Sequence, residues 1–435
     1  MATWYKENYK NGYPAVTLTC DQKCDVAIIG GGLAGLSLAY QLGRYDIDFI
    51  LIERGLIGDS ASGLNGGFCS AGWAASKGEI MKKFGKEFAI DFHKISREGL
   101  AWMTALIESE AFADVEKKKG CLNVFLDQES ELMKNKLDRE NLIFDEHAQF
   151  ISRNELNLFT SSKRYTYGIL SDNGFYFNPL KFLDRLKGEI LQTGGRIFEN
   201  SMMEAFYERD GKFIIKVGNN KSIRAERIVL ATGGSAGEET GYLRSRWIPL
   251  KTYIGVTAPL AHLAKRHFIK DIAISDSRRS GNYYHLLPDT RLMWGRDISA
   301  FNKNSFITGL KQVKNEISFF YPDLVNDVGG IDKLSIDYYW YGNMAYSFFK
   351  LPYVGQVYPA VFALTAFGGH GMNTAPAAAI VLAEFLAGVS DRVSIFDRIP
   401  KSWNGNILGP YAAELIINYT RLKEDLQFVL RNRGV

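Results

Sequence analysis

The stretch from Cys24 to Arg54 constrains the fold of this chain more than any other. It begins with an apolar run from Val26 to Ile29, turns through three closely spaced glycines, and ends in a second apolar run that stops at Glu53. A short apolar run that enters a glycine turn is typical of a buried parallel strand. Apolar residues recur at helical spacing after the turn. The stretch therefore predicts a strand, a tight turn, a helix and a second strand, the unit that binds a dinucleotide.

The three glycines each suit one requirement of a dinucleotide site. Gly30 permits the tight turn, Gly32 leaves the backbone open to a pyrophosphate, and Gly35 lets the helix lie close to the sheet. The helix N-terminus directs its N–H groups and its positive dipole end at the phosphates. Glu53, 18 residues after Gly35, stands where a ribose-binding carboxylate belongs. The alternative is a glycine-rich turn without a ligand, but the order of these features favours a binding site. The candidate contacts are Gly30, Gly32, Leu33, Ala34, Gly35, Glu53 and Arg54.

Composition limits the remaining function classes. The 435 residues are 46% hydrophobic and 23% charged, which is ordinary for a globular chain that is long enough for two domains. The net charge is +4 and no block of lysine and arginine interleaves with aromatic residues, so nucleic acid is not indicated.

Four cysteines do not form a disulfide framework in a chain of this size. Cys20 and Cys24 lack a second pair of metal ligands, so we expect no metal. Residues 1–14 have no signal-peptide pattern, and the most apolar helical run, Ala375 to Gly388, is too short to span a bilayer. These features predict a cytoplasmic protein without a membrane span.

Three further segments place small residues at the expected edge of the sheet. The loop from Gly55 to Phe68 is rich in small residues, which lets backbone N–H groups approach a large ligand; the alternative is a mobile surface linker. Apolar strands at 227–231 and 361–366 each run into a glycine turn, and the second turn opens a helix over 375–386. Met203 opens a small antiparallel meander predicted at 203–207, 213–217 and 222–225. The candidates from these segments are Ser60, Ser62, Asn65, Gly66, Gly67, Met203, Thr232, Gly233, Gly369, His370, Gly371, Met372 and Asn373.

The pattern elsewhere is helical or aromatic. We expect helices over 79–112 and 129–150, a helix that begins after Asn178 at Pro179 and runs to Thr193, and a mostly helical tail after Asp391. Aromatic residues are dense from Trp247 to Tyr341, which predicts an antiparallel sheet whose aromatic face covers the cofactor. The alternative for each of these residues is core packing. The residues predicted to form the face that covers the cofactor are Tyr253, Tyr283, Tyr284, His285 and Trp340.

Several motifs together resemble one family. They are Ala61-Ser62-Gly63-Leu64-Asn65-Gly66-Gly67, Ala231-Thr232-Gly233, Asp276-x-Arg278 with Tyr283-Tyr284, Asp289-x-Arg291-Leu292, Trp340-x-Gly342, Leu351-Pro352-x-x-Gly355 and Gly368-Gly369-His370-Gly371. Over nearly its whole length the chain resembles the D-amino-acid oxidase superfamily of FAD-dependent oxidoreductases, within the gamma-glutamylputrescine oxidoreductase subgroup. Leu64 departs from that subgroup, which usually has arginine before Asn-Gly-Gly.

The resemblance implies an α/β fold. A Rossmann-like FAD-binding domain of the glutathione-reductase type would consist of residues 1–95, 174–245 and 346–435. An α+β substrate domain built on an antiparallel sheet would consist of residues 96–173 and 246–345. It also implies non-covalent FAD, with a thioether link to Cys69 as the alternative.

The implied chemistry is oxidation of an amine or amino acid. Hydride passes from the carbon next to nitrogen to flavin N5, and the imine hydrolyses to an aldehyde or keto acid. Positioning and a water-poor cover would supply the rate, without an acid–base dyad of the hydrolase kind. Lys251 is a candidate for assisting oxygen, as a lysine does in some relatives; oxygen or another acceptor would reoxidise the flavin.

The residue at position 344 bears on the substrate. Relatives that oxidise glycine-like substrates carry an arginine two residues after the glycine of Trp-x-Gly, and it binds the substrate carboxylate. Met344 takes that place here, although an arginine elsewhere, Arg246, Arg278 or Arg296, could substitute. We therefore predict an amine substrate of the gamma-glutamylputrescine kind. The alternatives are an oxidase of glycine, sarcosine or D-amino acids, and a flavin-binding protein without turnover.

Overall fold

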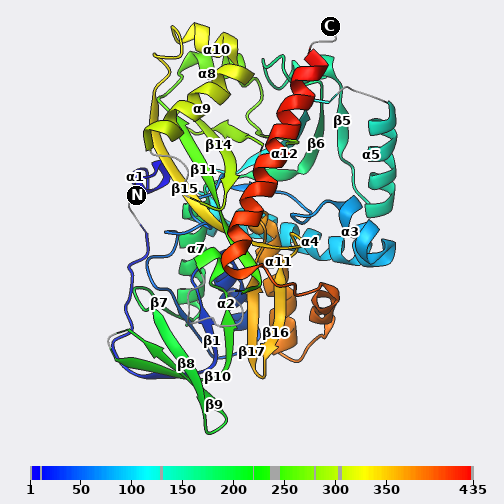
Figure 1. The fold of residues 1–435 in the computed structure, drawn as a ribbon. Coiled ribbons are helices and arrows are strands. Elements are labelled where there is room, and N and C mark those ends of the chain that lie inside the picture. The colour runs from blue at the N-terminus through cyan, green and yellow to red at the C-terminus, as the bar shows by residue number, and fades with distance from the viewer. Residues whose placement is uncertain are drawn as a thin grey trace.

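The structure is a computed structural model that describes residues 2–9, 12–127, 131–218, 220–235, 245–278, 281–301 and 306–432. Two β-sheets form its two halves, and Figure 1 shows the first sheet below the second. The long C-terminal helix runs up the front of the upper half in that view.

The first sheet contains the predicted dinucleotide unit. Among the described residues it has eight strands, six of them in the order β16-β17-β10-β1-β2-β7, with β9 and β8 attached beside β10. β1 is parallel to β2 and β10, and β10 is parallel to β17. The bounds are β1 (Gln22–Ile29), β2 (Phe49–Ile52), β7 (Arg196–Phe198), β8 (Met203–Arg209), β9 (Lys212–Val217), β10 (Lys221–Leu230), β16 (Tyr353–Tyr358) and β17 (Val361–Thr365).

The sequence prediction of this sheet is confirmed with one change. The buried strands predicted at 26–29, 49–52 and 361–366 are present and fully buried. The strands expected at 222–225 and 227–231 are one continuous strand, β10. Its first half pairs with the meander strand β9, and residues 223–230 pair with β1.

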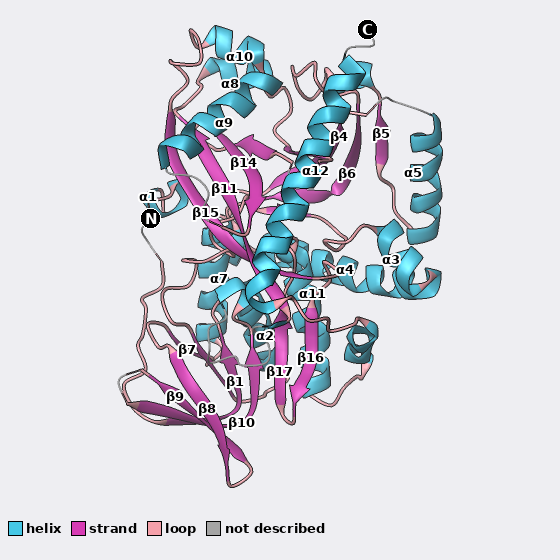
Figure 2. Ribbon diagram, viewed as in Figure 1, coloured by secondary structure: helices cyan, strands magenta, loops and turns pink. Residues whose placement is uncertain are grey.

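Alternation along β1 assigns its two faces to two different cores. Val26 and Ile28 belong to a cluster formed with the helices, whereas Ala27 and Ile29 belong to a cluster formed with the meander. Helices therefore cover one face of the sheet and the meander covers the other, which Figure 2 shows by its colouring. The covering helices are α2 (Leu33–Arg44), α7 (Pro179–Gln192) and α11 (Gly371–Leu386), and α4 (Lys86–Ile107) packs against α11.

The second sheet is antiparallel except where β12 runs parallel to β4. Its described strands follow the order β15-β11-β14-β13-β12-β4-β6-β3, and β5 pairs with β6. The bounds are β3 (Phe68–Cys69), β4 (Lys118–Phe125), β5 (Gln149–Ile151), β6 (Tyr167–Tyr176), β11 (Trp247–Thr257), β12 (Ala273–Asp276), β13 (Tyr283–Leu286), β14 (Leu292–Ser299) and β15 (Ile336–Ser347). Both β6 and β15 run across an expected domain boundary, so the division into domains at those residues stays a prediction.

The other helices differ in places from the predicted ones. The helix expected over 79–112 is broken at Gly85, whose φ of 92° favours glycine, and the helix expected over 129–150 ends at Phe144 before strand β5. Asn178 caps α7 as predicted, because its side chain accepts a hydrogen bond from the N–H of Lys181. The remaining helices are α1 (Trp4–Glu7), α3 (Lys77–Phe84), α5 (Glu131–Phe144), α6 (Arg153–Leu156), α8 (His262–His267), α9 (Phe306–Phe320), α10 (Pro322–Asp327) and α12 (Gly409–Asn432), with short 3₁₀ turns at Glu110–Phe112, Gly233–Ser235, Arg392–Arg398 and Asn406–Leu408.

Within these described ranges, no helix is both long enough and apolar enough to cross a membrane.

The closest approach in the dinucleotide unit is between Gly35 and Gly30. A Cβ atom on Gly35 would lie 1.9 Å from the carbonyl oxygen of Gly30, so no larger residue fits while α2 keeps its place. We expect Gly35→Ala to lower the free energy of unfolding by about 1–3 kcal/mol, as overpacking does, and to lower FAD content. Thermal unfolding and the ratio of flavin to protein absorbance measure both.

Gly43 in the same helix is the matched control. A Cβ there would lie 3.8 Å from the ring of Phe49, an ordinary contact. Gly43→Ala should therefore be neutral or stabilise by up to about 1 kcal/mol through helix propensity. Equal behaviour of the two variants would refute the tight-approach argument.

Candidate functional site

A cavity of about 770 Å³ lies between the two sheets. One side is formed by the glycine turn after β1, the end of β2, and the residues that follow β10 and β17, all at the carboxyl edge of the first sheet. The other side is formed by residues of β4, β11, β12, β13 and β15. In open α/β sheets ligands bind at this carboxyl edge, so the cavity stands where the sequence predicts the dinucleotide.

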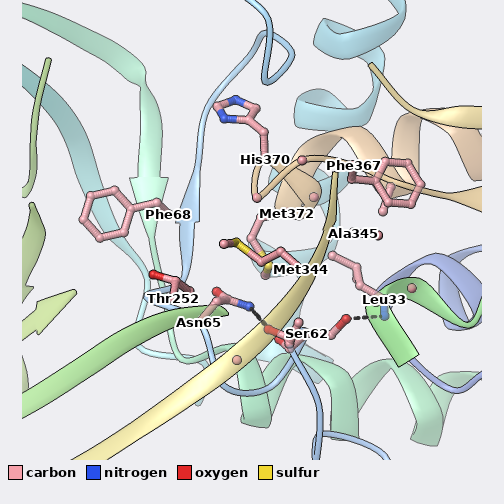
Figure 3. Close-up of a pocket in the computed structure, with 18 of the residues that line it drawn as sticks. Leu33, Ser62, Asn65, Phe68, Thr252, Met344, Ala345, Phe367, His370 and Met372 are labelled. Atoms are coloured by element: carbon pink, nitrogen blue, oxygen red, sulfur yellow. Dashed lines mark hydrogen bonds between the residues drawn. The ribbon is translucent and has the colours of Figure 1, made fainter. Parts of the chain in front are cut away.

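The N-terminus of α2 faces this cavity without a side chain of its own as a cap. Gly32 is the N-cap residue, and the hydroxyl of Ser62 instead accepts a hydrogen bond from the N–H of Leu33 at 2.9 Å (Figure 3). No acidic residue occupies the first turn of the helix. The positive end of the helix dipole is therefore available to an anionic group in the cavity.

Two backbone N–H groups, one before and one after β2 in the chain, hold the carboxylate of Glu53. Its two carboxylate oxygens accept hydrogen bonds from the N–H of Gly31 at 2.8 Å and of Gly55 at 3.0 Å. Each oxygen keeps a further lone pair, so this carboxylate can also accept from ribose hydroxyls.

The loop from Ala61 to Gly67 is fixed by three side chains that contact three successive carbonyl oxygens. The indole N–H of Trp340 donates to Leu64 at 2.8 Å, the hydroxyl of Tyr5 donates to Asn65 at 3.0 Å, and His285 Nε2 lies 3.1 Å from the oxygen of Gly66. Burial lowers the pKa of His285 to about 4, so its ring is neutral near pH 7. Leu64, the departure from the subgroup pattern, packs in the same buried cluster as Tyr5 and Trp340.

Asn65 closes the loop from inside. Its amide donates to the carbonyl oxygens of Ala61 and Ser62 at 2.9 and 2.8 Å, and its side-chain oxygen accepts from the N–H of Gly67 at 2.7 Å. The loop is thus hydrogen-bonded both within itself and to side chains of the second sheet.

Besides an oxygen of Asp297, which forms an ion pair with Arg421, two buried polar atoms at the cavity have no hydrogen-bond partner among the described residues, Thr232 Oγ1 and His370 Nε2. Thr232 follows β10, and His370 precedes α11, whose first turn has no side-chain cap. Burial lowers the pKa of His370, so that its ring favours the neutral form. Buried polar atoms are normally paired, and a bound ligand would pair these two.

Most of the predicted cofactor residues line the cavity. These are Gly30, Gly32, Leu33, Ala34, Glu53, Arg54, Ser60, Ser62, Asn65, Gly66, Met203, Thr232, Gly233, Gly369, His370, Gly371 and Met372. Gly35 and Gly67 do not line it, because their role is close packing: a Cβ on Gly67 would lie 1.9 Å from the oxygen of Phe177. Asn373 points away from it and donates to the carbonyl oxygens of Gly72 and Ser96.

Of the residues predicted to cover the substrate, the structure brings Tyr283 to the cavity. Its ring lies over Gly295 and Gly66, where a Cβ would come within 3.0 Å of it, and its centroid is 5.6 Å from that of Phe68. Thr252 Oγ1 is 3.3 Å from its hydroxyl.

The other predicted cover residues lie elsewhere. Tyr284 is fully buried on the opposite face of β13, stacked on Trp294, because neighbours on a strand alternate. Tyr253 belongs to that same core cluster. Trp340 and His285 hold the loop from behind, and the ammonium of Lys251 lies 5.3 Å from the ring centroid of Tyr341 and outside the cavity.

Several cavity residues were not identified from the sequence. Phe68, Asn123, Thr252, Ser275 and Asn282 line the substrate side together with the predicted Met344, and Lys77, Glu140 and Glu146 line the part next to α3 and α5. Alternation could have identified Cys121 and Asn123 as one face of β4, but not which ligand that face meets. The thiol of Cys69 is fully buried in the helix-side core and does not line the cavity.

Charged side chains at the cavity are mostly paired. Arg278 donates to both carboxylate oxygens of Asp276 at 2.8–3.2 Å, and Lys77 forms an ion pair with Glu146. Burial alone would raise the pKa of Glu146, but contacts with His93 and Lys77 outweigh it and lower the pKa to about 2. Glu146 is therefore ionised at neutral pH.

Comparison with known proteins agrees with this geometry. The family model described as FAD dependent oxidoreductase (DAO) matches residues 25–385. The chain belongs to this family. The predicted D-amino-acid oxidase superfamily, the FAD cofactor and the FAD-dependent oxidoreductase activity are thereby confirmed.

Relatives match over nearly the whole chain at low identity. A probable oxidoreductase OrdL of Haemophilus influenzae is 24% identical, covering 96% of each chain, and the gamma-glutamylputrescine oxidoreductase of Escherichia coli is 23% identical, covering 92% of each. The solved glycine oxidase of Geobacillus kaustophilus superposes with a TM-score of 0.70 at 18% identity, covering 88% of this chain and 98% of that one. This superposition confirms the predicted fold class.

The residues present fit FAD. The α2 N-terminus and the bare glycine turn would hold its pyrophosphate, and Glu53 its adenosine ribose. The partnerless atoms of Thr232 and His370 would be satisfied by the same ligand. That FAD binds the protein without a covalent bond stays a prediction.

Removal of the negative charge at position 53 tests the ribose assignment. We expect Glu53→Gln to raise the Kd for FAD about 10- to 100-fold, because hydrogen bonds to a charged group contribute about 1.5–3 kcal/mol. Glu226→Gln, an exposed carboxylate on β10 of the same sheet, is the control and should leave the Kd unchanged. Flavin fluorescence during titration of the apoprotein measures both; retention of flavin by Glu53→Gln equal to the parent's would disprove the assignment.

The neighbours Tyr283 and Tyr284 provide a second test. Tyr283→Ala should slow flavin reduction by the substrate about 10²-fold while FAD stays bound, since a misplaced substrate loses its reactive geometry. Tyr284→Phe should leave that rate unchanged and lower the free energy of unfolding by about 1–3 kcal/mol, because its buried hydroxyl bonds those of Tyr165 and Tyr321. Anaerobic stopped-flow and denaturant unfolding measure these; the reverse pattern would contradict the placement.

Proposed function

We propose that this protein oxidises the C–N bond of an extended amine of the gamma-glutamylputrescine class, giving an imine and then an aldehyde. Bound FAD supplies a two-electron acceptor for the hydride of the carbon next to nitrogen. The relative from Escherichia coli named above supports this substrate class for the chain.

The observation that carries the proposal is that no available cation lies near Met344 in the described part of the chain. Of the described residues, three cationic side chains line the cavity, Arg54, Lys77 and Arg278. Arg54 is exposed just after β2 at the dinucleotide edge, and Arg278 is committed to Asp276. Arg246 and Arg296, the other substitutes considered, do not line the cavity.

A free α-amino acid would place its carboxylate next to the reacting carbon. Beside Met344 and the ring of Tyr283 that carboxylate would have no charged partner among these residues, and an unpaired buried charge is costly. A neutral amine meets no such cost there. Phe68, Tyr283 and Met344 instead offer apolar surface for a carbon chain.

The part of the cavity next to α3 and α5 supports a long substrate with polar groups at its far end. Lys77, Glu146 and Glu140 line it and offer charges of both signs. A gamma-glutamyl group ends in an ammonium and a carboxylate. Its carboxylate would pair with Lys77 and its ammonium with Glu146, in place of the ion pair between these two residues. Charged groups far from the reacting nitrogen then fit, while an adjacent carboxylate does not.

A substrate panel tests the proposal. We expect gamma-glutamylputrescine and N-acylated diamines to bleach the flavin anaerobically at least tenfold faster than glycine, sarcosine or D-alanine. Bleaching measured at 450 nm reports the chemical step whichever acceptor, oxygen or another, reoxidises the enzyme. Faster bleaching by the small amino acids would favour the alternative of a small amino-acid oxidase.

Lys77 supplies the variant for the same panel. Lys77→Met should raise KM for gamma-glutamylputrescine about 10-fold or more, since a charge-assisted contact contributes about 1.5–3 kcal/mol, and should leave unmodified putrescine unaffected. An equal rise in KM for both amines would show that the gamma-glutamyl group does not bind in this part of the cavity.

A further inference from the structure

A row of cavity residues crosses neighbouring strands of the second sheet. Tyr283 of β13 is in register with Ser275 of β12. Ser275 is in register with Asn123 of β4, and Asn123 with Ile169 of β6. Residues in register on neighbouring strands point to the same face of a sheet, and all four line the cavity. We call these four residues the cross-strand row.

The cross-strand row leads from the reacting end of the proposed substrate to its charged end. The reacting end lies beside Tyr283. Beyond Ile169 the sheet continues with β5, and Ala148, just before β5, lines the cavity together with Glu146 and its partner Lys77. Figure 1 shows β5 and α5 next to each other at one side of the sheet. A substrate that extends from Tyr283 to Lys77 therefore passes over the middle of the row.

The middle of the cross-strand row is polar and uncharged. Asn123 and Ser275 are both half-buried, and the hydroxyl of Ser275 lies 3.5 Å from the side-chain oxygen of Asn123, a long contact that leaves both groups available to a ligand. Cys121 and Ser171 form the next cross-strand pair and also line the cavity. Burial raises the pKa of the Cys121 thiol to about 12, so it carries no charge at neutral pH. This part of the cavity suits a neutral polar group.

An amide is the neutral polar group that Asn123 matches best. The asparagine side chain offers an N–H donor and a carbonyl acceptor, and a substrate amide offers the complementary pair. An amide that loses water without gaining hydrogen bonds is costly to bury, so a site for it must supply both partners. In gamma-glutamylputrescine the amide lies midway between the reacting carbon and the glutamyl α-carbon. Asn123 likewise lies between Tyr283 and the ion pair of Lys77.

We propose that Asn123 selects N-acylated amines by pairing its side-chain amide with the amide of the substrate. This inference rests on the proposed function and adds which group is recognised in the middle of the substrate. A linear polyamine carries an ammonium at that place, and no residue of the cross-strand row is a carboxylate. Asp276, next to Ser275 in the chain, is already paired with Arg278.

Three amines test the inference on the FAD-loaded full chain, by anaerobic flavin bleaching at increasing amine concentration. Asn123→Leu should raise the half-saturating concentration of N-acetylputrescine and of gamma-glutamylputrescine about 10-fold, because both lose their amide partners. Hexylamine has no polar group at that place, so Asn123→Leu should bind it at least as tightly as the parent does. Unchanged bleaching by hexylamine also shows that the variant is folded and holds its flavin.

Two controls separate the amide from the rest of the substrate. Asn135→Leu makes the same change on the exposed side of α5, outside the cavity, and should leave all three amines unaffected. Lys77→Met should weaken gamma-glutamylputrescine but not N-acetylputrescine, because an acetyl group carries no charge for Lys77 to bind. Only the Asn123 variant should weaken both N-acylated amines.

A second variant keeps the size of the side chain and changes its charge. Asn123→Asp should shift the preference between N-acetylputrescine and spermidine about 10-fold toward spermidine, because a carboxylate would then face its internal ammonium. Unchanged binding of N-acetylputrescine by both Asn123 variants, or an equal loss for hexylamine, would overturn the inference and leave the proposed function in place. A parent protein whose flavin no N-acylated amine bleaches would refute the proposed function and this inference with it.

Discussion

The contacts between three side chains and the carbonyl oxygens of Leu64, Asn65 and Gly66 determine the shape of the cofactor site. These residues belong to a loop that is neither helix nor strand, yet the loop forms part of the cavity between the sheets. Tyr5 comes from the N-terminal helix, His285 from β13 and Trp340 from β15. The second sheet therefore fixes a wall of a site whose motif lies on the first sheet.

This dependence couples the two sheets at the cofactor site. Tyr5 packs edge-on against Trp340 at 5.9 Å, and the indole N–H of Trp4 donates to Asp289 at 2.8 Å. The N-terminal segment thus lies against the second sheet although it precedes β1 in the chain. A substitution of Tyr5 or Trp340 would be expected to alter the loop, since each donates a hydrogen bond to it.

The sequence was sufficient for features whose cause is local. The glycine turn, the strand that ends at Glu53 and the cap at Asn178 follow from backbone conformation and short-range hydrogen bonds. The substrate side depends on pairing between distant strands, so aromatic density alone could not separate Tyr283 from Tyr284. Strict alternation on β13 would have separated their faces, but only the register with β12 and β14 shows which face meets the cavity. Nothing local in the sequence indicated that Lys251 lies beside Tyr341 while Thr252 lines the cavity.

The orientation of the C-terminal helix was also not predictable from the sequence. Its sequence predicts an amphipathic helix on the outside of the protein, and apolar residues would ordinarily be assigned to the buried face. Glu414 and Arg421 instead face the protein, where Ser299, Ala300 and Asp297 provide the partners that offset the loss of hydration. These polar contacts determine which side of the helix faces the protein, and they contribute less to the free energy of folding. Once the helix is held in that rotation, Leu415 and Leu422 remain exposed, at 71% and 59%.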